Sequence, residues 1–414
     1  MRTFPTAGKP WSEVKQALTD AKKGDYAWEE GKLPVYIYYL DEELHEVVTQ
    51  AYQMFFTENA LGRRAFPSLE RMEREIVEMS LDLLGAGPGA GGSFTSGGTE
   101  SIFLALKTVR DRARAERPEI RQPNIILPYT AHATFNKAAH LLGIEAKRVP
   151  SRPDHRADVE AIERAIDENT ILIVGSAPSY PNGLFDTIPE LGQLALRRGI
   201  WLHVDACVGG FLAPFVRQLN YPIPPFDFSV PGVTSMSADL HKYGYAAKGA
   251  SVVLYRDAKL KEYQHYEYVG WSRGIYSTET FPGSRPGGAV AAAWAAMTFL
   301  GEDGYRRAAR IIMDTKHKLI DGIRAIGGLR VLEPSELCIF LYDSTDPDVD
   351  INAVAGEMGK KGWFVGRIAD PKAIHVAVNP AIEVGIDAYL ADLRDVVAQV
   401  RSNRTVGKLD FRTY

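Results

Sequence analysis

The sequence predicts an α/β protein in which a large domain with a mostly parallel sheet precedes a small C-terminal α+β domain. Between about residues 123 and 257, short apolar runs alternate with segments at helical spacing, which is the pattern of successive βα units. From residue 301 this alternation stops, and helices and strand pairs follow in another order. The 414 residues, of which 45% are hydrophobic, suffice for a large core and a second lobe.

The part of the chain before the alternation is predicted to be mainly helical. A helix is expected near residues 12–23, a second from residue 42, and a third in SLERMEREIVEMSLDLL after Pro67. An aromatic stretch, VYIYYL, precedes the second helix. The Gly-rich segment that begins at Gly85 resembles a linker, but its end, SFTSGGTES, runs directly into the helical pattern IFLALKTVRDRARA.

The alternating part and the C-terminal part give a consistent series of elements. Strands are expected at residues 123–128, 145–150, 170–178, 201–210 and 250–257, with helices at 132–143, 157–166 and 189–199. In the C-terminal part, helices are expected at 301–326, 351–362 and 386–402, and strands at 328–334, 337–343, 363–368 and 373–378. We therefore divide the chain into an N-terminal segment (1–60), a large domain (61–300) and a small domain (301–414).

Composition and charge exclude several classes of function. A net charge of −4 without a basic stripe argues against nucleic-acid binding. Two cysteines, Cys207 and Cys338, are too few for a disulfide framework and indicate a reducing compartment. The start of the sequence has no apolar core of a signal peptide, and the longest apolar run, 289–300, is too short to span a bilayer. We expect a cytoplasmic protein without a transmembrane segment.

Residues 233–255, VTSMSADLHKYGYAAKGASVVLY, contain the most chemically suggestive group of side chains. Asp239, His241 and Lys242 lie together in a loop of small residues before an apolar run. Burial and neighbouring cations lower the pKa of a lysine and make its amine a nucleophile for Schiff-base formation. The alternative is an ordinary surface lysine, because most lysines are solvated.

Two further features have the character of binding elements. SFTSGGTES at the start of a helix offers backbone N–H groups, hydroxyls and the helix dipole to an anion, unless it is a simple N-cap. In WLHVDACVGG, the period of a strand places His203, Asp205 and Cys207 on one face. These three side chains could ligate a metal, with His241 or Asp239 as further ligands. Alternatively, the carboxylate could lie beneath a heteroaromatic ring nitrogen.

Pyridoxal phosphate (PLP) requires a Schiff-base lysine, an acid for its ring nitrogen and a cradle for its phosphate. Lys242, Asp205 and residues 96–99 supply all three, and the combination is more specific than any one member. Functional groups in parallel sheets gather at the carboxyl ends of the strands. We therefore expect the following groups to be neighbours: residues 95–99, His132, residues 176–180, Asp205 and the loop of Lys242.

Longer motifs indicate a family. The chain contains GKLPVYIY, TSGGTESI, AHATFNKAA, HVDACVGGF, GVTSMSADLHKYGYAAKGASVVLY and GIYSTETFPGSRPGG. Across about residues 30–400 it resembles the sphingosine-1-phosphate lyases. These are PLP-dependent enzymes of fold type I, the aspartate aminotransferase fold, related to the group II amino-acid decarboxylases.

The resemblance implies a role for each matching residue. Lys242 would bind PLP as a Schiff base, Asp205 would pair with the ring nitrogen, and His132 would stack on the ring, although His132 could instead cap a helix. The phosphate would be held by Gly98, Thr99 and His241. Gly283 and Ser284 would complete that cradle from a partner subunit, which implies a homodimer to whose interface and active site residues 1–60 contribute. The positions near the substrate's phosphate would be Tyr38, Asn59 and Lys248.

One position departs from the family pattern. Where the family has Asn-Pro-Leu-His, this chain has Asn59-Ala60-Leu61-Gly62, followed by Arg63 and Arg64. The histidine helps to hold the substrate in the family, so its absence bears on substrate identity more than on the chemistry. An arginine could replace it as a phosphate clamp.

The resemblance implies a carbon–carbon lyase that cleaves phosphorylated sphingoid bases to a long-chain aldehyde and phosphoethanolamine. A PLP-dependent amino-acid decarboxylase is the main alternative, because it uses the same electron sink and breaks a different bond. Two other classes stay open, namely a metal hydrolase and a non-catalytic PLP-binding module.

Overall fold

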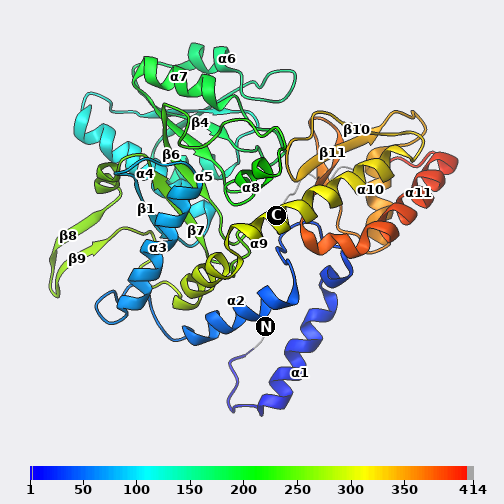
Figure 1. Ribbon diagram of the computed structural model, residues 1–414, viewed down its shortest axis with the longest axis horizontal. Coiled ribbons are helices and arrows are strands. Elements are labelled where there is room, and N and C mark those ends of the chain that lie inside the picture. Colours follow the sequence, from blue (N-terminus) through cyan, green and yellow to red (C-terminus); the bar gives the residue numbers. More distant parts are fainter. Residues whose placement is uncertain (2, 408–414) are drawn as a thin grey trace.

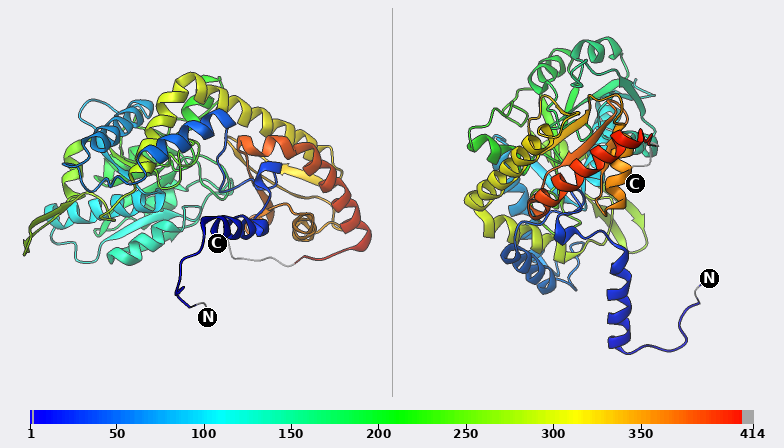
Figure 2. Two further views of the ribbon diagram at one scale, coloured as in Figure 1. Left: turned by 90° about the horizontal axis from the view of Figure 1, so that it is seen from below. Right: turned by 90° about the vertical axis from the view of Figure 1, so that its right-hand side faces the viewer.

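The computed structural model describes residues 1 and 3–407, which form a large lobe and a smaller C-terminal lobe. Figures 1 and 2 show the two lobes side by side, joined by the long helix α9 (Gly287–Arg324). The helical backbone geometry is interrupted inside α9 at Gly301, whose φ of 52° is non-helical. The helix therefore passes through residue 300, where we placed the boundary between domains, and changes direction one residue later.

A seven-stranded sheet forms the centre of the large lobe. Its order is β1-β7-β6-β5-β4-β2-β3, and β7 is the one strand of this sheet that runs antiparallel to its neighbours. The predicted α/β class with a mostly parallel sheet is confirmed. The bounds of its strands are β1 (Gly91–Thr95), β2 (Asn124–Pro128), β3 (Glu145–Val149), β4 (Thr170–Ser176), β5 (Trp201–Asp205), β6 (Val233–Ala238) and β7 (Ser251–Tyr255).

Helices cover both faces of this sheet, because alternate residues of its strands point to opposite sides. On β2, Ile125 and Leu127 belong to the apolar cluster beneath α4 and α5, whereas Ile126 belongs to the larger cluster on the other face. The helices of the large lobe and the N-terminal part are α1 (Trp11–Ala21), α2 (Glu42–Met54), α3 (Pro67–Leu83), α4 (Gly98–Glu116), α5 (Thr134–Leu142), α6 (Val159–Ala165), α7 (Ile188–Arg198) and α8 (Ala213–Gln218).

The small lobe has its own antiparallel sheet of order β10-β11-β13-β12. The end of α9 and two further helices pack with it. Its elements are β10 (Leu329–Leu332), β11 (Ile339–Ser344), α10 (Ile351–Lys360), β12 (Gly366–Ile368), β13 (Ala373–Ala377) and α11 (Ile386–Asn403). This is the α+β arrangement expected from the sequence.

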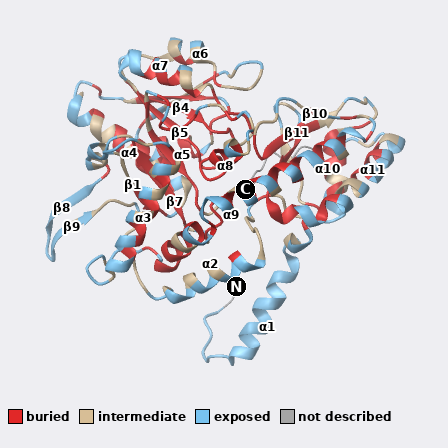
Figure 3. Cartoon of the chain, viewed as in Figure 1, coloured by how far each residue is buried: buried red, intermediate tan, exposed pale blue. Residues whose placement is uncertain are grey.

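Two elements extend away from the body of the protein. Helix α1 has no buried residue, and the hairpin of β8 (Tyr266–Trp271) and β9 (Gly274–Thr278) is exposed along nearly its whole length. Both are drawn almost entirely in the colour of exposed residues in Figure 3. The sequence analysis did not anticipate the hairpin. None of the helices in the described ranges combines the length and the apolar character needed to cross a bilayer.

Candidate active site

The predicted PLP-binding side chains lie at the carboxyl end of the large sheet. Asp205 is the last residue of β5, and β6 ends at Ala238, so Asp239 begins the loop that carries Lys242. Strand β1 ends at Thr95, immediately before the turn into α4. Parallel strands bring their carboxyl ends to one edge, which explains why residues far apart in sequence meet here.

Lys242 forms an ion pair with a buried carboxylate. Its Nζ lies 3.0 Å from Oδ2 of Asp239, and Nε2 of His241 lies 3.7 Å from the same oxygen. Burial opposes the charge on Lys242, but the attraction of Asp239 prevails and the pKa of the lysine lies well above its usual value. The expectation that neighbouring cations depress the pKa of Lys242 was wrong, because its nearest charged neighbour is an anion.

The start of α4 packs directly onto this loop. A Cβ atom on Gly98 would lie 2.8 Å from Sγ of Cys207 and 2.9 Å from either carboxylate oxygen of Asp239, so only glycine fits. Gly97, the N-cap residue of α4, has a φ of 154° and makes no side-chain hydrogen bond to cap the helix. The first N–H groups of α4 are thus available to an anion, as the sequence indicated. Thr99, in the same turn, is exposed.

Asp205 is 8% exposed and accepts two hydrogen bonds on a single oxygen. The backbone N–H of Cys207 donates to Oδ1 over 3.1 Å, and the hydroxyl of Ser237 donates to the same atom over 3.2 Å. Among the described residues, no hydrogen bond to Oδ2 is made. This oxygen is therefore available to a ring N–H group.

His132 caps a helix and also lies near the predicted site, whereas its stacking on the cofactor ring stays a prediction. Its Nδ1 accepts a hydrogen bond from the backbone N–H of Thr134 over 3.1 Å, which is a cap on α5. Burial lowers the pKa of His132, with Asp205 opposing that shift and Lys242 adding to it, so the ring is also close to the predicted site. In the neutral ring the proton must then lie on Nε2. His132 can donate a hydrogen bond from Nε2 but cannot act as a base there.

Tyr38 and Lys248 lie together beside Lys242, although they come from distant parts of the chain. Nζ of Lys248 lies 4.7 Å from the centroid of the Tyr38 ring and donates to the carbonyl oxygen of His241 over 2.9 Å. Burial and the charge of Lys242 lower the pKa of Lys248 to about 8. Burial raises the pKa of Tyr38, although Lys242 opposes this shift, so the phenol stays protonated.

Asn59, Gly283 and Ser284 form a separate group in this chain. Nδ2 of Asn59 donates to Oγ of Ser284 over 2.9 Å, and its Oδ1 accepts from the N–H groups of Leu61 and Arg285. Within residues 1 and 3–407, no hydrogen bond or ion pair connects Gly283 or Ser284 with Lys242 or His241. Their contribution to the cradle of a partner subunit stays a prediction.

The arginines after Gly62 differ in their surroundings. Arg63 donates to Glu279 over 3.1 Å, and Lys261 lies 2.9 Å from the same carboxylate oxygen. Arg63 therefore neutralises a carboxylate of its own chain, which weakens its interpretation as a phosphate clamp. Arg64 is exposed.

Sequence reasoning missed Glu100, a buried carboxylate in the first turn of α4. One of its oxygens accepts from the backbone N–H and the hydroxyl of Ser96 over 2.7 and 2.6 Å. The other accepts from the N–H of Phe281 over 2.9 Å. Glu100 thus fixes the turn before α4 and attaches the segment of Gly283 and Ser284 to it. The available signal was a glutamate in the first turn of the helix, where a carboxylate can accept hydrogen bonds from backbone N–H groups at the helix start.

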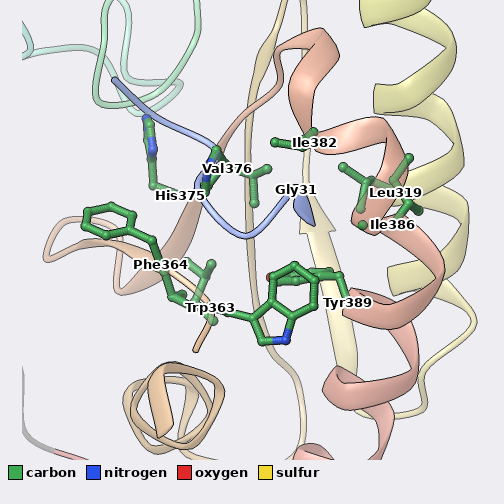
Figure 4. Close-up of a pocket in the computed structure, with 13 residues that line it drawn as sticks. Gly31, Leu319, Trp363, Phe364, His375, Val376, Ile382, Ile386 and Tyr389 are labelled. Atoms are coloured by element: carbon green, nitrogen blue, oxygen red, sulfur yellow. The ribbon is translucent and has the colours of Figure 1, made fainter. Parts of the chain in front are cut away.

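The apolar pocket in Figure 4 lies elsewhere. It is lined by Gly31 and Pro34 of the N-terminal segment and by residues of the small lobe, and it contains none of the predicted site residues. Its link to the site is indirect: Nε2 of His375 is 2.9 Å from the carbonyl oxygen of Tyr180, whose ring centroid lies 6.4 Å from that of His132.

Comparison with known proteins identifies the family. Residues 40–338 match the model of the pyridoxal-dependent decarboxylase conserved domain. The chain is 43% identical to the sphingosine-1-phosphate lyase of Arabidopsis thaliana over 400 residues, which cover 94% of this chain and 73% of that protein. It is 41% identical to sphingosine-1-phosphate lyase 1 of Rattus norvegicus over 407 residues, covering 97% and 71%. The chain belongs to the sphingosine-1-phosphate lyase family.

Solved structures agree with this assignment to the lyase family. The sphingosine-1-phosphate lyase of Burkholderia pseudomallei K96243 superposes with a TM-score of 0.92 at 38% identity, covering 98% of this chain and 94% of that one. Glutamate decarboxylase of Lactobacillus brevis superposes with a TM-score of 0.84 at 21% identity over 97% and 95% of the two chains, which supports the fold alone. The predicted fold type I, the enzyme class and the PLP cofactor are confirmed.

Proposed function

We propose that this enzyme is a PLP-dependent carbon–carbon lyase that cleaves phosphorylated sphingoid bases to a long-chain aldehyde and phosphoethanolamine. The observation that carries the proposal is the convergence of Lys242, Asp205 and the uncapped start of α4 at one edge of the sheet, in a member of the lyase family. Each feature alone has an ordinary structural explanation, but together they match the three requirements of one cofactor.

The residues present fit PLP. Lys242 would carry it, Oδ2 of Asp205 would accept a hydrogen bond from its ring nitrogen, and Gly98, Thr99 and His241 would surround its phosphate at the start of α4. The close packing of Gly98, which no larger residue could reproduce, leaves the N–H groups of this turn accessible. When bound, PLP supplies the electron sink for the electron pair released on breaking the Cα–Cβ bond.

The side chains around the proposed PLP site would transfer protons and supply charge to the substrate. The amine of Lys242 could take the proton of the substrate's C3 hydroxyl, because Asp239, 3.0 Å away, would stabilise the resulting ammonium. Nε2–H of His132 can donate a hydrogen bond across the face of the site. Tyr38, Lys248 and Asn59 would lie near the phosphate of the substrate, where the ammonium of Lys248 supplies positive charge.

Amino-acid decarboxylation is the second candidate. It is supported by the match to the decarboxylase domain and by 34% identity to the probable L-tyrosine/L-aspartate decarboxylase of Methanothermobacter thermautotrophicus, over 85% of this chain and 94% of that protein. Gly62, in place of the family histidine, also leaves the substrate open. Release of a long-chain aldehyde from a phosphorylated sphingoid base supports the lyase, whereas carbon dioxide from an amino acid supports the decarboxylase.

We also propose that the enzyme is a cytoplasmic homodimer in which Gly283 and Ser284 of one subunit complete the phosphate cradle of the other. Within the described part of one chain, Ser284 hydrogen-bonds to Asn59 and not to Lys242 or His241, which is consistent with such sharing. Two inactive variants, Lys242→Ala and Ser284→Asp, should then recover part of the activity when mixed under exchange conditions, since one of the hybrid sites is intact. Lack of recovery in demonstrably mixed dimers would contradict shared sites.

The first experiment compares the visible absorption of the purified protein with that of Lys242→Ala. We expect a Schiff-base band that borohydride abolishes in the unmodified enzyme, no such band in the variant, and loss of aldehyde formation. Lys137→Ala, a change at an exposed lysine of α5, is the matched control. It should retain the Schiff-base band and aldehyde formation. A colourless enzyme that stays colourless after PLP is added would refute the proposal.

A further inference from the structure

The aligned residues of β5 and β6 form a buried polar row beneath the proposed cofactor site. The two strands are parallel neighbours, with His203 paired to Ser235 and Asp205 paired to Ser237. Because side chains alternate along a strand, these four lie on the same face of the sheet. The His-x-Asp motif that the sequence singled out as a possible metal site is thus matched by a Ser-x-Ser motif on the adjacent strand.

These side chains are connected by an unbroken series of hydrogen-bonding contacts. Nε1 of Trp201 donates to Oγ of Ser235 over 2.7 Å, and that oxygen lies 2.8 Å from Nδ1 of His203. Nε2 of His203 lies 3.2 Å from Oγ of Ser237, whose hydroxyl donates to Oδ1 of Asp205 over 3.2 Å.

Only one placement of the protons satisfies the whole series. Indole N–H is a donor only, so Ser235 accepts from Trp201 and gives its own proton to Nδ1 of His203. His203 then carries its proton on Nε2 and donates to Ser237, which donates to Asp205. With the opposite tautomer, Ser235 would have no acceptor, and the proton of Ser237 would be drawn to His203 and away from Asp205.

Burial keeps the row in this state. His203, Ser235 and Ser237 have no exposed surface. Burial lowers the pKa of His203 to about 4, although Asp205 opposes this shift, so the ring is neutral at physiological pH. Both ring nitrogens are engaged by hydroxyls, which leaves His203 no free lone pair for a metal. A neutral His203 also leaves the negative charge of Asp205 uncompensated from this side.

We propose that Trp201, Ser235, His203 and Ser237 are positioning residues that form a one-directional hydrogen-bond relay ending on Oδ1 of Asp205. The relay holds the carboxylate in place and leaves Oδ2 for the ring nitrogen of the cofactor. This role rests on the proposed PLP-dependent function. It explains why a histidine and two serines, rather than apolar residues, occupy the centre of the sheet.

The first test examines His203 by NMR of the cofactor-free enzyme labelled with ¹⁵N-histidine. The signal is assigned by its disappearance in His203→Gln. We expect the proton on Nε2, with Nδ1 unprotonated, at neutral pH, and we expect Ser235→Ala to alter the Nδ1 shift because the donor to that atom is removed. A proton on Nδ1, or a charged ring, would overturn the relay. This readout does not depend on bound PLP.

The second test measures kcat, KM and the visible spectrum of the PLP-loaded variants Ser237→Ala and Ser235→Ala. Loss of a hydrogen bond to the charged carboxylate should lower kcat on the order of tenfold in Ser237→Ala, with KM little changed and the cofactor band shifted. Ser235 lies one hydrogen bond further from Asp205. Ser235→Ala should therefore lower kcat and shift the cofactor band in the same direction as Ser237→Ala, but by less.

Ser80→Ala provides the matched control for both variants, because it removes a fully buried hydroxyl from α3, where the partner is the carbonyl oxygen of Ile76. Its kcat and spectrum should equal those of the unmodified enzyme. If the unmodified enzyme forms a normal band and Ser235→Ala and Ser237→Ala behave like Ser80→Ala, the relay is refuted while the proposed function stands. If the unmodified enzyme binds no PLP, the proposed function fails, and the relay's role toward the cofactor fails with it.

Discussion

Two groups of residues that contain predicted site residues are built in different ways. The Lys242 site, comprising Lys242, Asp239, His241, Asp205 and Gly98, forms at the ends of neighbouring strands and includes deeply buried charges. The loop cluster, comprising Asn59, Arg63, Glu279 and Ser284, is formed by contacts between loops and is partly exposed. Desolvation strengthens electrostatic interactions in the first group, whereas solvent weakens them in the second. The strand-end residues should therefore control the chemistry, and Asn59 with the neighbouring Gly62 the choice of substrate.

The largest expected effect tests the first half of this comparison. Asp205→Asn should still bind PLP but lose kcat on the order of a hundredfold, because an amide does not stabilise positive charge on the ring nitrogen. Steady-state kinetics and the visible spectrum measure the two effects separately. Asp227→Asn, at another buried aspartate that pairs with Arg217, is the control. Equal kcat values for Asp205→Asn and the unmodified enzyme would refute the assignment of Asp205 as the partner of the PLP ring nitrogen.

Glu100 connects the turn before α4, in the Lys242 site, to the segment of Phe281 that leads into the loop cluster. Its substitution therefore tests whether the loop segment supports PLP binding. Glu100→Gln leaves one of the two acceptor oxygens and should weaken PLP binding by about tenfold, since hydrogen bonds to the carboxylate fix the turn before α4. Equilibrium titration of the cofactor-free enzyme with PLP measures this. Glu190→Gln, at an exposed glutamate in the first turn of α7, should bind PLP normally. Equal affinity in both variants would mean that Glu100 does not support the cradle.

The lowered pKa of Lys248 predicts how substrate affinity depends on pH. Lys248 has a pKa of about 8, so its ammonium is present below this value and is lost as the pH rises through it. KM for a phosphorylated substrate should therefore rise several-fold between about pH 7 and about pH 9. Lys248→Arg keeps its charge over this range and should show a nearly flat profile. Parallel profiles for the two enzymes would exclude Lys248 as the titrating group.

The smallest expected effect concerns the loop cluster. A Cβ atom on Gly62 would meet Phe66 at 3.4 Å and the carbonyl oxygen of Asn59 at 3.5 Å, both ordinary contacts, so Gly62→His should fold normally. If the pocket is otherwise that of a lyase, this change should raise kcat/KM for phosphorylated sphingoid bases a few-fold. Gly62→Ala, which adds no ring nitrogen, is the control. Low activity in all three enzymes would point to a different substrate.

Much of the site was predictable because it depends on local patterns. Asp205 ends β5, Lys242 comes soon after β6, and the turn before α4 follows β1, so all three lie at strand ends, which share one edge in a parallel sheet. The pKa of Lys242 was predicted in the wrong direction, because the sequence does not show which of the nearby charges lies 3.0 Å away. Glu100 was missed because its partner Phe281 is far along the chain. The β8–β9 hairpin was missed because its strands have no buried face to produce a regular apolar pattern.

The sequence by itself determined the α/β class, the positions of the strands other than β1, β6, β8 and β9, and the residue types needed for PLP. These follow from periodicity and from motifs a few residues long. Only the tertiary structure decided which side chains share protons and charges. The register of β5 on β6 aligned His203 with Ser235 and Asp205 with Ser237, and the packing of α4 placed Gly98 against Asp239. Hydrogen bonds and ion pairs act over about 3 Å, a distance that is set by the folded arrangement of segments far apart in the chain.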